Sequence, residues 1–387
     1  MEPLQFYDFF AGVGMVDLAL RPEWQCVWAN DFDSRKAAIY TANHGGDHFH
    51  PGDVAEVRGR DLPAPVDMAW ASFPCQDLSL AGWRRGMTGG RSGAFWQFYR
   101  VMGELHRDGL RPPVIVLENV VGLLQGPDFG SLCEALASLD LQFGALVIDA
   151  AMFLPQSRPR VFVVAADRAL DSAAFATGAP VAAWTPPSLT NAHDRLPPAT
   201  RRLWRWWNLP APNTVLAPAG LLVEDEPEGV RWHSESETAR LIGMMSEVNR
   251  AKLDTALQSP RREVGFLYRR TRNGQQRAEV RFDGIAGCLR TPTGGSSRQT
   301  LMVVDCGKVR SRLLSPREAA RFMGIPDDFI LPDSYNEAYH AMGDGVATPV
   351  VRWLGEHLLK PLALHAAHGT ARSEPSGYSI RSESTHA

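Results

Sequence analysis

The chain contains 387 residues with a formal net charge of −3; 44% of its residues are hydrophobic and 21% are charged. This length allows one large or two medium domains, and this composition is ordinary for a globular enzyme. No apolar run approaches the about 18 residues of a membrane-spanning helix, and Met1–Leu4 lacks the basic region of a secretory signal. Five cysteines without CxxC spacing argue against a disulfide framework or a structural zinc site. We therefore expect a cytoplasmic protein with no metal and no membrane partner.

Short apolar runs alternate with helical patterns over the first 165 residues. The predicted strands are Leu4–Phe9, Gln25–Asn30, Val66–Ser72, Val114–Glu118, Ala145–Ala150 and Val161–Ala165. The helical segments between them include Ser34–Asn43, Ala94–His106 and Gly130–Leu139. This alternation predicts an α/β fold with a parallel, doubly wound, Rossmann-like sheet.

The pattern becomes irregular after residue 166, where proline and tryptophan are frequent and no period is sustained. Regular patterns return with a capped helix at Ser315 and with a final apolar helix that begins near Pro349. We predict a first domain over 1–166, a smaller, irregular domain over 167–309, and a return to the first domain over 310–365. The Ser- and Arg-rich residues 366–387 are expected to form a disordered tail.

A basic cluster lies in the second predicted domain. Between Arg250 and Arg281, nine basic and three acidic residues give a local net charge of +6, with Phe266 and Tyr268 among them. A solvated charged face is one interpretation. Contact with a phosphate backbone is favoured, because the chain is acidic elsewhere.

The first predicted strand leads into a Gly-x-Gly turn, Gly12 to Gly14, that opens a helix. Such a turn lets the backbone approach a ligand, and the helix N-terminus favours polar or anionic groups. Asp31 stands at the tip of the second strand, where an acid accepts ribose hydroxyls, and Asp53 is a candidate for an adenine amino group. The alternative is that both acids are helix N-caps. The absence of a Gly-x-x-x-x-Gly-Lys-Ser/Thr motif excludes a P-loop kinase or ATPase.

Cys75 follows a predicted strand in the stretch SFPCQDLSLAG. Open α/β sheets bind their ligands at this end of the strands, and a thiolate stabilised by positive charge is a nucleophile. An isolated cysteine is more often a small hydrophobic residue, so Cys75 alone does not decide the function.

Eight segments of the chain, in order, resemble the motifs of the cytosine-C5 DNA methyltransferases of bacteria. They read DFFAGVG, ANDFD, GDVAEV, FPCQDLS, LENVVGLL, LPQSRPRVFVVA, LSPREAARFMGIPDDF and MGDGVATPVV, and they cover residues 4–165 and 310–360. The resemblance implies a large domain that binds S-adenosylmethionine, a small target-recognition domain, and DNA in the cleft between them.

By this resemblance, Cys75 adds to C6 of cytosine, which makes C5 able to take a methyl group. Glu118 resembles the acid that hydrogen-bonds N3 and N4 of the base, a role that requires a raised pKa in a dry pocket. Arg160 resembles a contact to cytosine O2, and Arg158 a partner close to the cysteine. The alternative for these charged residues is a surface ion pair. Asn119 is expected to support the local backbone.

The resemblance also implies a set of cofactor contacts, namely Phe10, Gly12, Gly14, Asp31, Phe32, Asp53, Val54, Pro74, Asp344 and Val346. Two positions depart from the family pattern. Met15 follows Gly14 where a further glycine is frequent, and Gly343-Asp344-Gly345-Val346 replaces the usual Gly-Asn-Ser/Ala-Val. An acid at 344 would repel the methionine carboxylate of the cofactor unless it points elsewhere or carries a proton.

Residues 81–96, with five glycines, resemble a mobile loop that closes over DNA. Because a base inside a duplex cannot reach Cys75, base flipping is implied. The expected DNA contacts are Gln76, Ser79, Arg84, Arg85, Arg91, Arg290 and Arg298, the last two as base or phosphate readers in the Gly-rich stretch 288–304.

The favoured interpretation is a DNA cytosine-5 methyltransferase, solitary or part of a restriction–modification system, that acts as a monomer on double-stranded DNA at the nucleoid. It would use S-adenosylmethionine and release S-adenosylhomocysteine. In a restriction–modification system, a cognate endonuclease would act separately. An enzyme of the same fold that acts on tRNA is disfavoured by the long insert at 167–310. A catalytically silent DNA-binding protein is disfavoured because the catalytic set is present.

Overall fold

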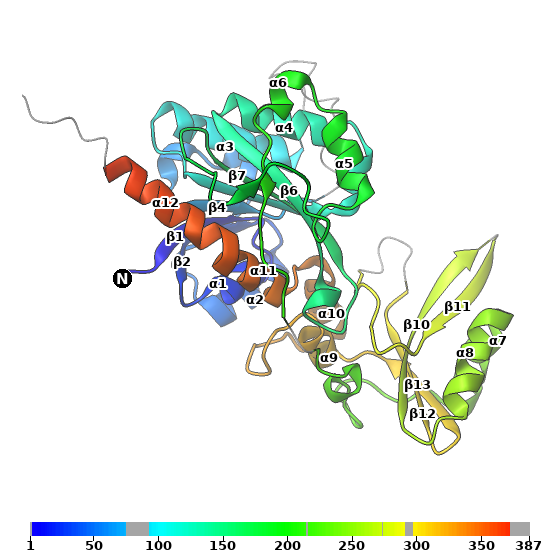
Figure 1. The fold of residues 1–387 in the computed structure, drawn as a ribbon. Helices are drawn as coiled ribbons and strands as arrows, with labels where there is room; N and C mark the ends of the chain where they lie inside the picture. Colours follow the sequence, from blue (N-terminus) through cyan, green and yellow to red (C-terminus); the bar gives the residue numbers. More distant parts are fainter. Residues whose placement is uncertain (1, 75–92, 214–215, 273, 291–296, 372–387) are drawn as a thin grey trace, which may run out of the picture.

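A seven-stranded sheet forms the centre of the large domain in the computed structural model, which describes residues 2–74, 93–213, 216–272, 274–290 and 297–371 (Figure 1). The strand order is β3-β2-β1-β4-β5-β7-β6. The strands are β1 (Leu4–Phe9), β2 (Trp24–Asp31), β3 (Phe49–Pro51), β4 (Met68–Ala71), β5 (Val114–Val120), β6 (Leu141–Asp149) and β7 (Pro159–Asp167). The six predicted strands and the α/β class are thus confirmed.

The sheet is mostly, not entirely, parallel. Strands β1 to β5 pair in parallel, whereas β7 runs antiparallel to both β5 and β6. The connection between β6 and β7 contains only a short 3₁₀ turn, Ala150–Met152. A parallel connection needs a crossover of a dozen or more residues, so this shorter link makes a hairpin.

Helices cover both faces of this sheet. Along β1, Phe6 belongs to one core with α1 (Met15–Leu20) and α2 (Ser34–His44), while Tyr7 and Phe9 belong to the other. That second core contains α3 (Ala94–Arg107) and α4 (Asp128–Ser138). The alternation of side chains along a strand therefore places apolar residues on both faces.

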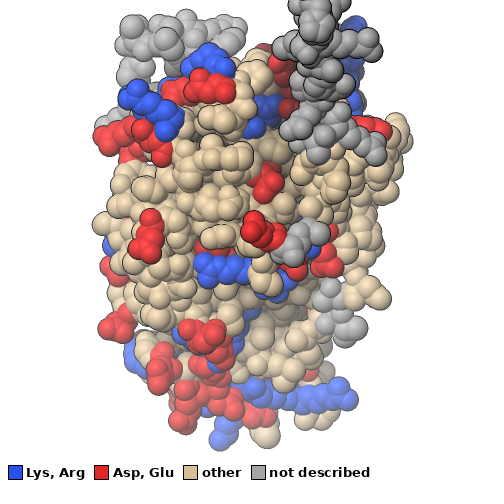
Figure 2. Space-filling model, turned by 90° about the vertical axis from the view of Figure 1, so that its left-hand side faces the viewer, with Lys and Arg blue, Asp and Glu red and all other residues tan. Residues whose placement is uncertain are grey.

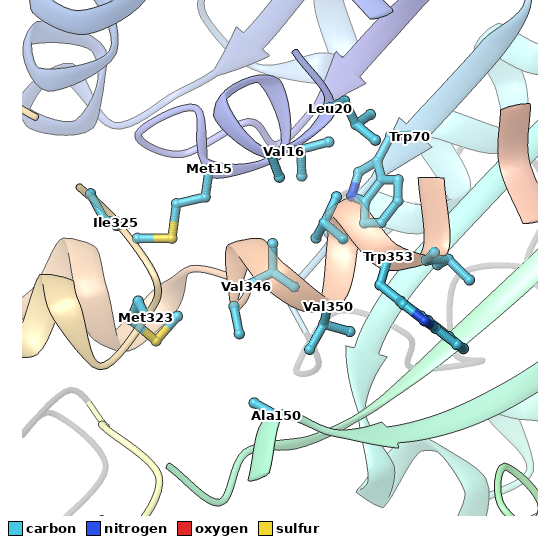
Figure 3. Packing of buried hydrophobic residues seen from close by; sticks show 14 of the residues in the cluster. Met15, Val16, Leu20, Trp70, Ala150, Met323, Ile325, Val346, Val350 and Trp353 are labelled. Carbon is cyan, nitrogen blue, oxygen red and sulfur yellow. The ribbon is translucent and has the colours of Figure 1, made fainter. Parts of the chain in front are cut away.

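The C-terminal part of the chain returns to the large domain through α9 (Pro316–Arg321), α10 (Tyr335–Asp344) and α11 (Thr348–Leu354). Helix α11 packs on α1, and Figure 3 shows Val350 of α11 in the same cluster as Val16 and Leu20 of α1. A π-helical turn, Gly355–Leu359, leads into α12 (Lys360–Ala371). The π turn lies next to Pro361, which lacks an N–H for the regular helical bond. Because α12 runs to Ala371, the prediction of a disordered tail from residue 366 was wrong for residues 366–371; residues 372–387 lie outside the described chain.

The segment 168–209 packs on the large domain, so the domain boundary predicted at residue 167 was wrong. Its elements are β8 (Ala176–Thr177), α5 (Pro187–Asp194), α6 (Pro198–Arg201) and β9 (Trp206–Trp207), and they contact β6 and α4. Trp184, Trp204 and Trp207 are buried against the sheet, and Trp207 Nε1 donates to Val164 O at 3.0 Å. The tryptophans that made this segment look irregular are core residues of the first domain.

The small domain has regular structure, unlike the irregular one predicted. Its antiparallel sheet, in the order β11-β10-β12-β13, contains β10 (Glu263–Arg272), β11 (Gln275–Arg281), β12 (Thr300–Asp305) and β13 (Lys308–Leu313). Helices α7 (Glu235–Gly243) and α8 (Glu247–Leu257) pack on it, and Leu253, Leu267 and Met302 lie in its separate core. Figure 1 shows this domain projecting from one end of the large domain.

The surface of the large domain that lies on the left in Figure 1 is largely uncharged across its middle, as Figure 2 shows. Acidic and basic residues are mixed toward its lower end. No helix among the described residues is long and apolar enough to cross a membrane.

Candidate active site

A cavity of about 760 Å³ lies where the carboxyl ends of β1, β2, β4 and β5 meet. This edge is where open α/β sheets bind ligands. The cavity brings together ten of the residues predicted for the site, namely Phe10, Gly12, Asp31, Phe32, Pro74, Glu118, Arg160, Arg290, Asp344 and Val346.

The turn after β1 lines this cavity, and its backbone has left-handed φ angles. Phe10 and Gly12 both have φ of 59°, in the left-handed region, and the Gly12 N–H donates to Asp31 Oδ2 at 2.9 Å. A Cβ on Gly14 would lie 2.4 Å from the His44 ring, so glycine there lets α1 begin close to α2. Gly14 faces His44 of α2 and does not line the cavity.

Asp31 is buried with its carboxylate at the cavity wall. Its second oxygen accepts from the Asp33 N–H at 2.9 Å, and Asp33 is the N-cap of α2, so the N-cap interpretation does not apply to Asp31. A carboxylate has about four lone-pair sites, which leaves acceptors for a ligand hydroxyl. The neighbouring Phe32 is 75% exposed and lines the cavity, an open aromatic face beside that acid.

Asp53 and Val54 are not among the residues that line the cavity. Asp53 is the N-cap of the 3₁₀ helix Val54–Glu56 and accepts from the Ala55 N–H at 2.9 Å. Val54 is buried in the adjacent core. The structure thus shows the capping role that was the alternative for Asp53.

Glu118 and Arg160 form an ion pair inside the cavity, with Arg160 Nε 3.1 Å from Glu118 Oε1. Burial raises the pKa of Glu118, although Arg160, Arg158 and a hydrogen bond with Ser72 act to lower it. The raised pKa is the direction that a proton-sharing role requires. Ser72, at the end of β4, was missed; its place at a strand end was the available signal.

Asn119 fixes the segment that precedes Cys75. Its side-chain amide donates to Phe73 O at 2.8 Å, and its oxygen accepts from the Val120 N–H at 2.9 Å. The predicted role of Asn119 in supporting the backbone is confirmed. The candidate residues Cys75, Gln76, Ser79, Arg84, Arg85 and Arg91 lie outside the described residues.

Arg158 is buried, and its guanidinium joins three segments of the chain. It donates to Leu289 O at 2.9 Å, to Gly343 O at 2.7 Å and to Gly345 O at 2.5 Å. Burial lowers the pKa of Arg158 to about 10. These contacts make Arg158 a positioning residue that ties the segment before β7 to Leu289 and to the end of α10.

Cys288 is a second thiol at the site that the sequence did not single out. It lines the cavity, and Arg158 Nη1 lies 3.3 Å from its sulfur. Burial alone would raise the pKa of this thiol, but the positive charges of Arg158, Arg160 and Arg290 lower it overall.

A second cavity of about 890 Å³ opens beside the first, and the two share Pro159, Cys288 and Arg290. Its lining contains much of the predicted basic cluster, including Lys252, Arg269, Arg270 and Arg281, together with the acids Glu279 and Asp283. The basic cluster thus adjoins the Glu118 pocket. Arg298 lines neither cavity; it lies against Asn336 and over the Tyr335 ring.

Comparison with known proteins agrees with this geometry. A family model described as C-5 cytosine-specific DNA methylase matches residues 4–360. The Type II methyltransferase M.BsuFI of Bacillus subtilis is 26% identical over 90% of this chain and 71% of its own length. The Type II methyltransferase M.HhaI of Haemophilus parahaemolyticus is also 26% identical, over 92% and 94%.

The fold is also similar to that of the Dnmt2 methyltransferase of S. pombe, with a TM-score of 0.58 at 18% identity over 93% of this chain and 99% of that structure. The family match extends over nearly the whole described chain, both domains included. The chain belongs to the C-5 cytosine-specific DNA methylase family and is an S-adenosylmethionine-dependent DNA cytosine-5 methyltransferase.

Proposed function

We propose that this enzyme methylates C5 of a cytosine that is flipped out of a specific sequence in double-stranded DNA, through a covalent adduct between Cys75 and C6. The observation that carries the proposal is a single cavity that contains both the Glu118–Arg160 pair and the Gly12–Asp31 turn. The first pair suits a pyrimidine base, the turn suits a nucleoside cofactor, and both line the same cavity.

The residues of this cavity fit S-adenosylmethionine. Asp31 keeps acceptors for the ribose hydroxyls, and the exposed ring of Phe32 offers a face for the adenine. Phe10, Gly12, Pro74 and Val346 would complete the contacts. When bound, the cofactor supplies an electrophilic methyl group.

The reaction requires electrons to enter and leave the cytosine ring. Addition of the Cys75 thiolate to C6 pushes negative charge toward N3 and O2, where protonated Glu118 donates to N3 and Arg160 donates to O2. C5 then takes the methyl group. Transfer of the C5 proton to water, return of the N3 proton to Glu118 and expulsion of the thiolate restore the aromatic ring and free Cys75.

The second cavity supports duplex DNA as the substrate. Its lysine and arginine side chains suit phosphate groups, and its shared wall with the first cavity places that contact beside the base pocket. A base within the helix cannot reach the pocket, so flipping accompanies binding. The names of the relatives as Type II methyltransferases favour a restriction–modification setting.

Transfer of a labelled methyl group to duplex DNA and to tRNA tests the substrate. We expect labelled DNA; label on tRNA alone would overturn the proposal.

A duplex containing 5-fluorocytosine at the methylated position tests the nucleophile. Because fluorine cannot leave as a proton does, we expect a stable adduct that peptide mapping places on Cys75 and that Cys75→Ser abolishes. Lack of an adduct despite bound cofactor would favour a silent DNA-binding protein. Methylation-sensitive sequencing of host DNA would identify the target.

A further inference from the structure

Lys36 and Asp344 form an ion pair on the wall of the first cavity. Lys36 Nζ lies 2.9 Å from Asp344 Oδ2, and both residues line the cavity. Lys36 stands in the first turn of α2, whereas Asp344 is the last residue of α10. The pair therefore joins two segments from opposite ends of the chain beside the proposed cofactor position.

Both charges of this pair remain accessible to a ligand. The side chains of Lys36 and Asp344 are 25% and 43% exposed, so neither is sealed in the core. Burial alone would lower the pKa of Lys36, but the charge of Asp344, with those of Asp31 and Asp33, raises it. The cavity wall thus presents the Lys36 amine and the Asp344 carboxyl group side by side.

We propose that Lys36 and Asp344 together bind the amino-acid end of S-adenosylmethionine. Lys36 donates to its α-carboxylate and Asp344 accepts from its α-ammonium. The inference rests on the proposed cofactor position. Two opposite charges in contact match a zwitterion whose own two charges sit on one carbon, and each contact is a charge-assisted hydrogen bond.

This arrangement also accounts for an acid at position 344. Alone, the Asp344 carboxylate would repel the carboxylate of the cofactor. Lys36 compensates that charge and adds an attractive partner. Lys36 is thus the specificity-determining residue that makes Asp344 compatible with an amino-acid ligand.

Two ligands separate this role from that of a structural clamp between α2 and α10. S-adenosylhomocysteine carries the amino-acid end, whereas methylthioadenosine shares the adenosine and the thioether but lacks that end. Loss of a structural clamp would weaken the binding of both ligands equally, because it disturbs the whole cavity. Loss of a zwitterion contact would weaken the binding of S-adenosylhomocysteine only.

The experiment is calorimetric titration of both ligands into the full-length wild-type protein and Lys36→Met. We expect the variant to bind S-adenosylhomocysteine about tenfold more weakly or worse, the loss of one charge-assisted bond, and methylthioadenosine within about twofold. Lys36→Arg should retain most of the affinity. The double variant Lys36→Met/Asp344→Asn should regain part of it, because the uncompensated acid is gone.

Arg35→Met is the matched control, since Arg35 precedes Lys36 in α2, pairs with Asp33 and does not line the cavity. Its affinities for both ligands should equal those of the wild type, and thermal unfolding should show that each variant is folded. Equal losses for both ligands in Lys36→Met, or no loss for S-adenosylhomocysteine, would overturn the inference. A wild-type protein that binds neither ligand would instead refute the proposed cofactor position.

Discussion

Met15 occupies the space that a side chain at position 345 would need. A Cβ built on Gly345 would lie 2.1 Å from Met15 Sδ and 2.6 Å from Met15 Cε. Met15 is buried at the start of α1, and Figure 3 shows its thioether extending toward Met323 and Ile325. The two departures from the family motifs are therefore complementary, because the large side chain of Met15 fills the space left by the missing side chain of Gly345.

Gly345→Ala should force Met15 out of this position. Because Met15 lines the first cavity, the proposed cofactor site, we expect weaker binding of S-adenosylhomocysteine, and a loss of about 1–3 kcal/mol in unfolding free energy from overpacking. Met15→Ala in the same chain should restore both, as measured by calorimetry and urea unfolding. Gly130→Ala in α4 is the control, since a Cβ there meets no atom within 4 Å among the described residues. Lack of rescue would show that the two positions are independent.

Arg158 and Arg160 should differ in what their loss does. Arg158→Ala leaves the carbonyls of Leu289, Gly343 and Gly345 without their donor, so we expect about 3 kcal/mol or more of destabilisation in urea unfolding. Arg160→Ala should unfold nearly as the wild type does and lose about a hundredfold in methyl transfer. The reverse pattern would contradict these assignments.

Glu118→Gln should lower methyl transfer by about a hundredfold or more while leaving S-adenosylhomocysteine binding intact, because the amide cannot deliver a proton to N3. Since the pKa of Glu118 is raised, the protonated form persists above the ordinary glutamate range and declines as the pH rises through the raised value. The wild-type pH profile of kcat/KM should contain this declining limb. If the pH profile of Glu118→Gln keeps the same decline in kcat/KM, another group is responsible for it.

Asp8 should make the stability of the fold depend on pH. It is fully buried in β1, and neither carboxyl oxygen has a hydrogen-bond partner among the described residues. Burial raises the pKa of Asp8 well above its usual value, with the charges of Asp17 and Asp31 adding to the effect. The folded protein therefore has its full stability below the ordinary aspartate pKa of the unfolded chain. Its unfolding free energy falls as the pH rises from that value toward the raised pKa of the folded state.

Asp8→Asn removes this titration, so its thermal unfolding curve should depend less on pH than that of the wild type. At pH 8 we expect the variant to be more stable by about 1 kcal/mol or more, because a neutral amide avoids the cost of the raised pKa, and each pKa unit corresponds to about 1.4 kcal/mol. Asp61→Asn, at an exposed position, serves as the control. Parallel pH curves for wild type and Asp8→Asn would exclude Asp8 as the source.

Arg269→Ala should weaken binding to duplex DNA of any sequence and reduce the slope of log affinity against log salt concentration by about 1. Arg269 lines the second cavity, whereas Arg231, the control, is an exposed arginine paired with Glu237. Fluorescence anisotropy at several salt concentrations measures both slopes. Equal slopes in Arg269→Ala and wild type would remove Arg269 from the DNA contact.

Local patterns in the sequence predicted the large domain well. Alternating apolar runs identified six strands, and the acid at the tip of β2 and Gly12 after β1 both line the first cavity. The direction of β7 was not predictable from its own residues, because it follows from the short link after β6. The tryptophans of segment 168–209 likewise showed no helical or strand periodicity in the sequence. They pack on the sheet and do not lie along one face of a helix.

Contacts between distant segments escaped prediction for a different reason. Met15 with Gly345 and Lys36 with Asp344 each join the N-terminal helices to the end of α10, and no local pattern encodes such a pair. Met15, Asp344 and Gly345 stood out only as departures from motifs, and Lys36 did not stand out at all. The structure shows that Met15 and Gly345 lie against each other and that Asp344 pairs with Lys36.

The first cavity takes one wall from residues 10–16 and another from residues 341–346, and the whole small domain is encoded between these two segments. On the ribosome, the seven strands of the large sheet emerge long before α10 and α11. Until those helices arrive, α1 has an uncovered apolar face and the cavity is open on one side. A chain that ends before α10 would therefore contain the small domain but lack one wall of the first cavity.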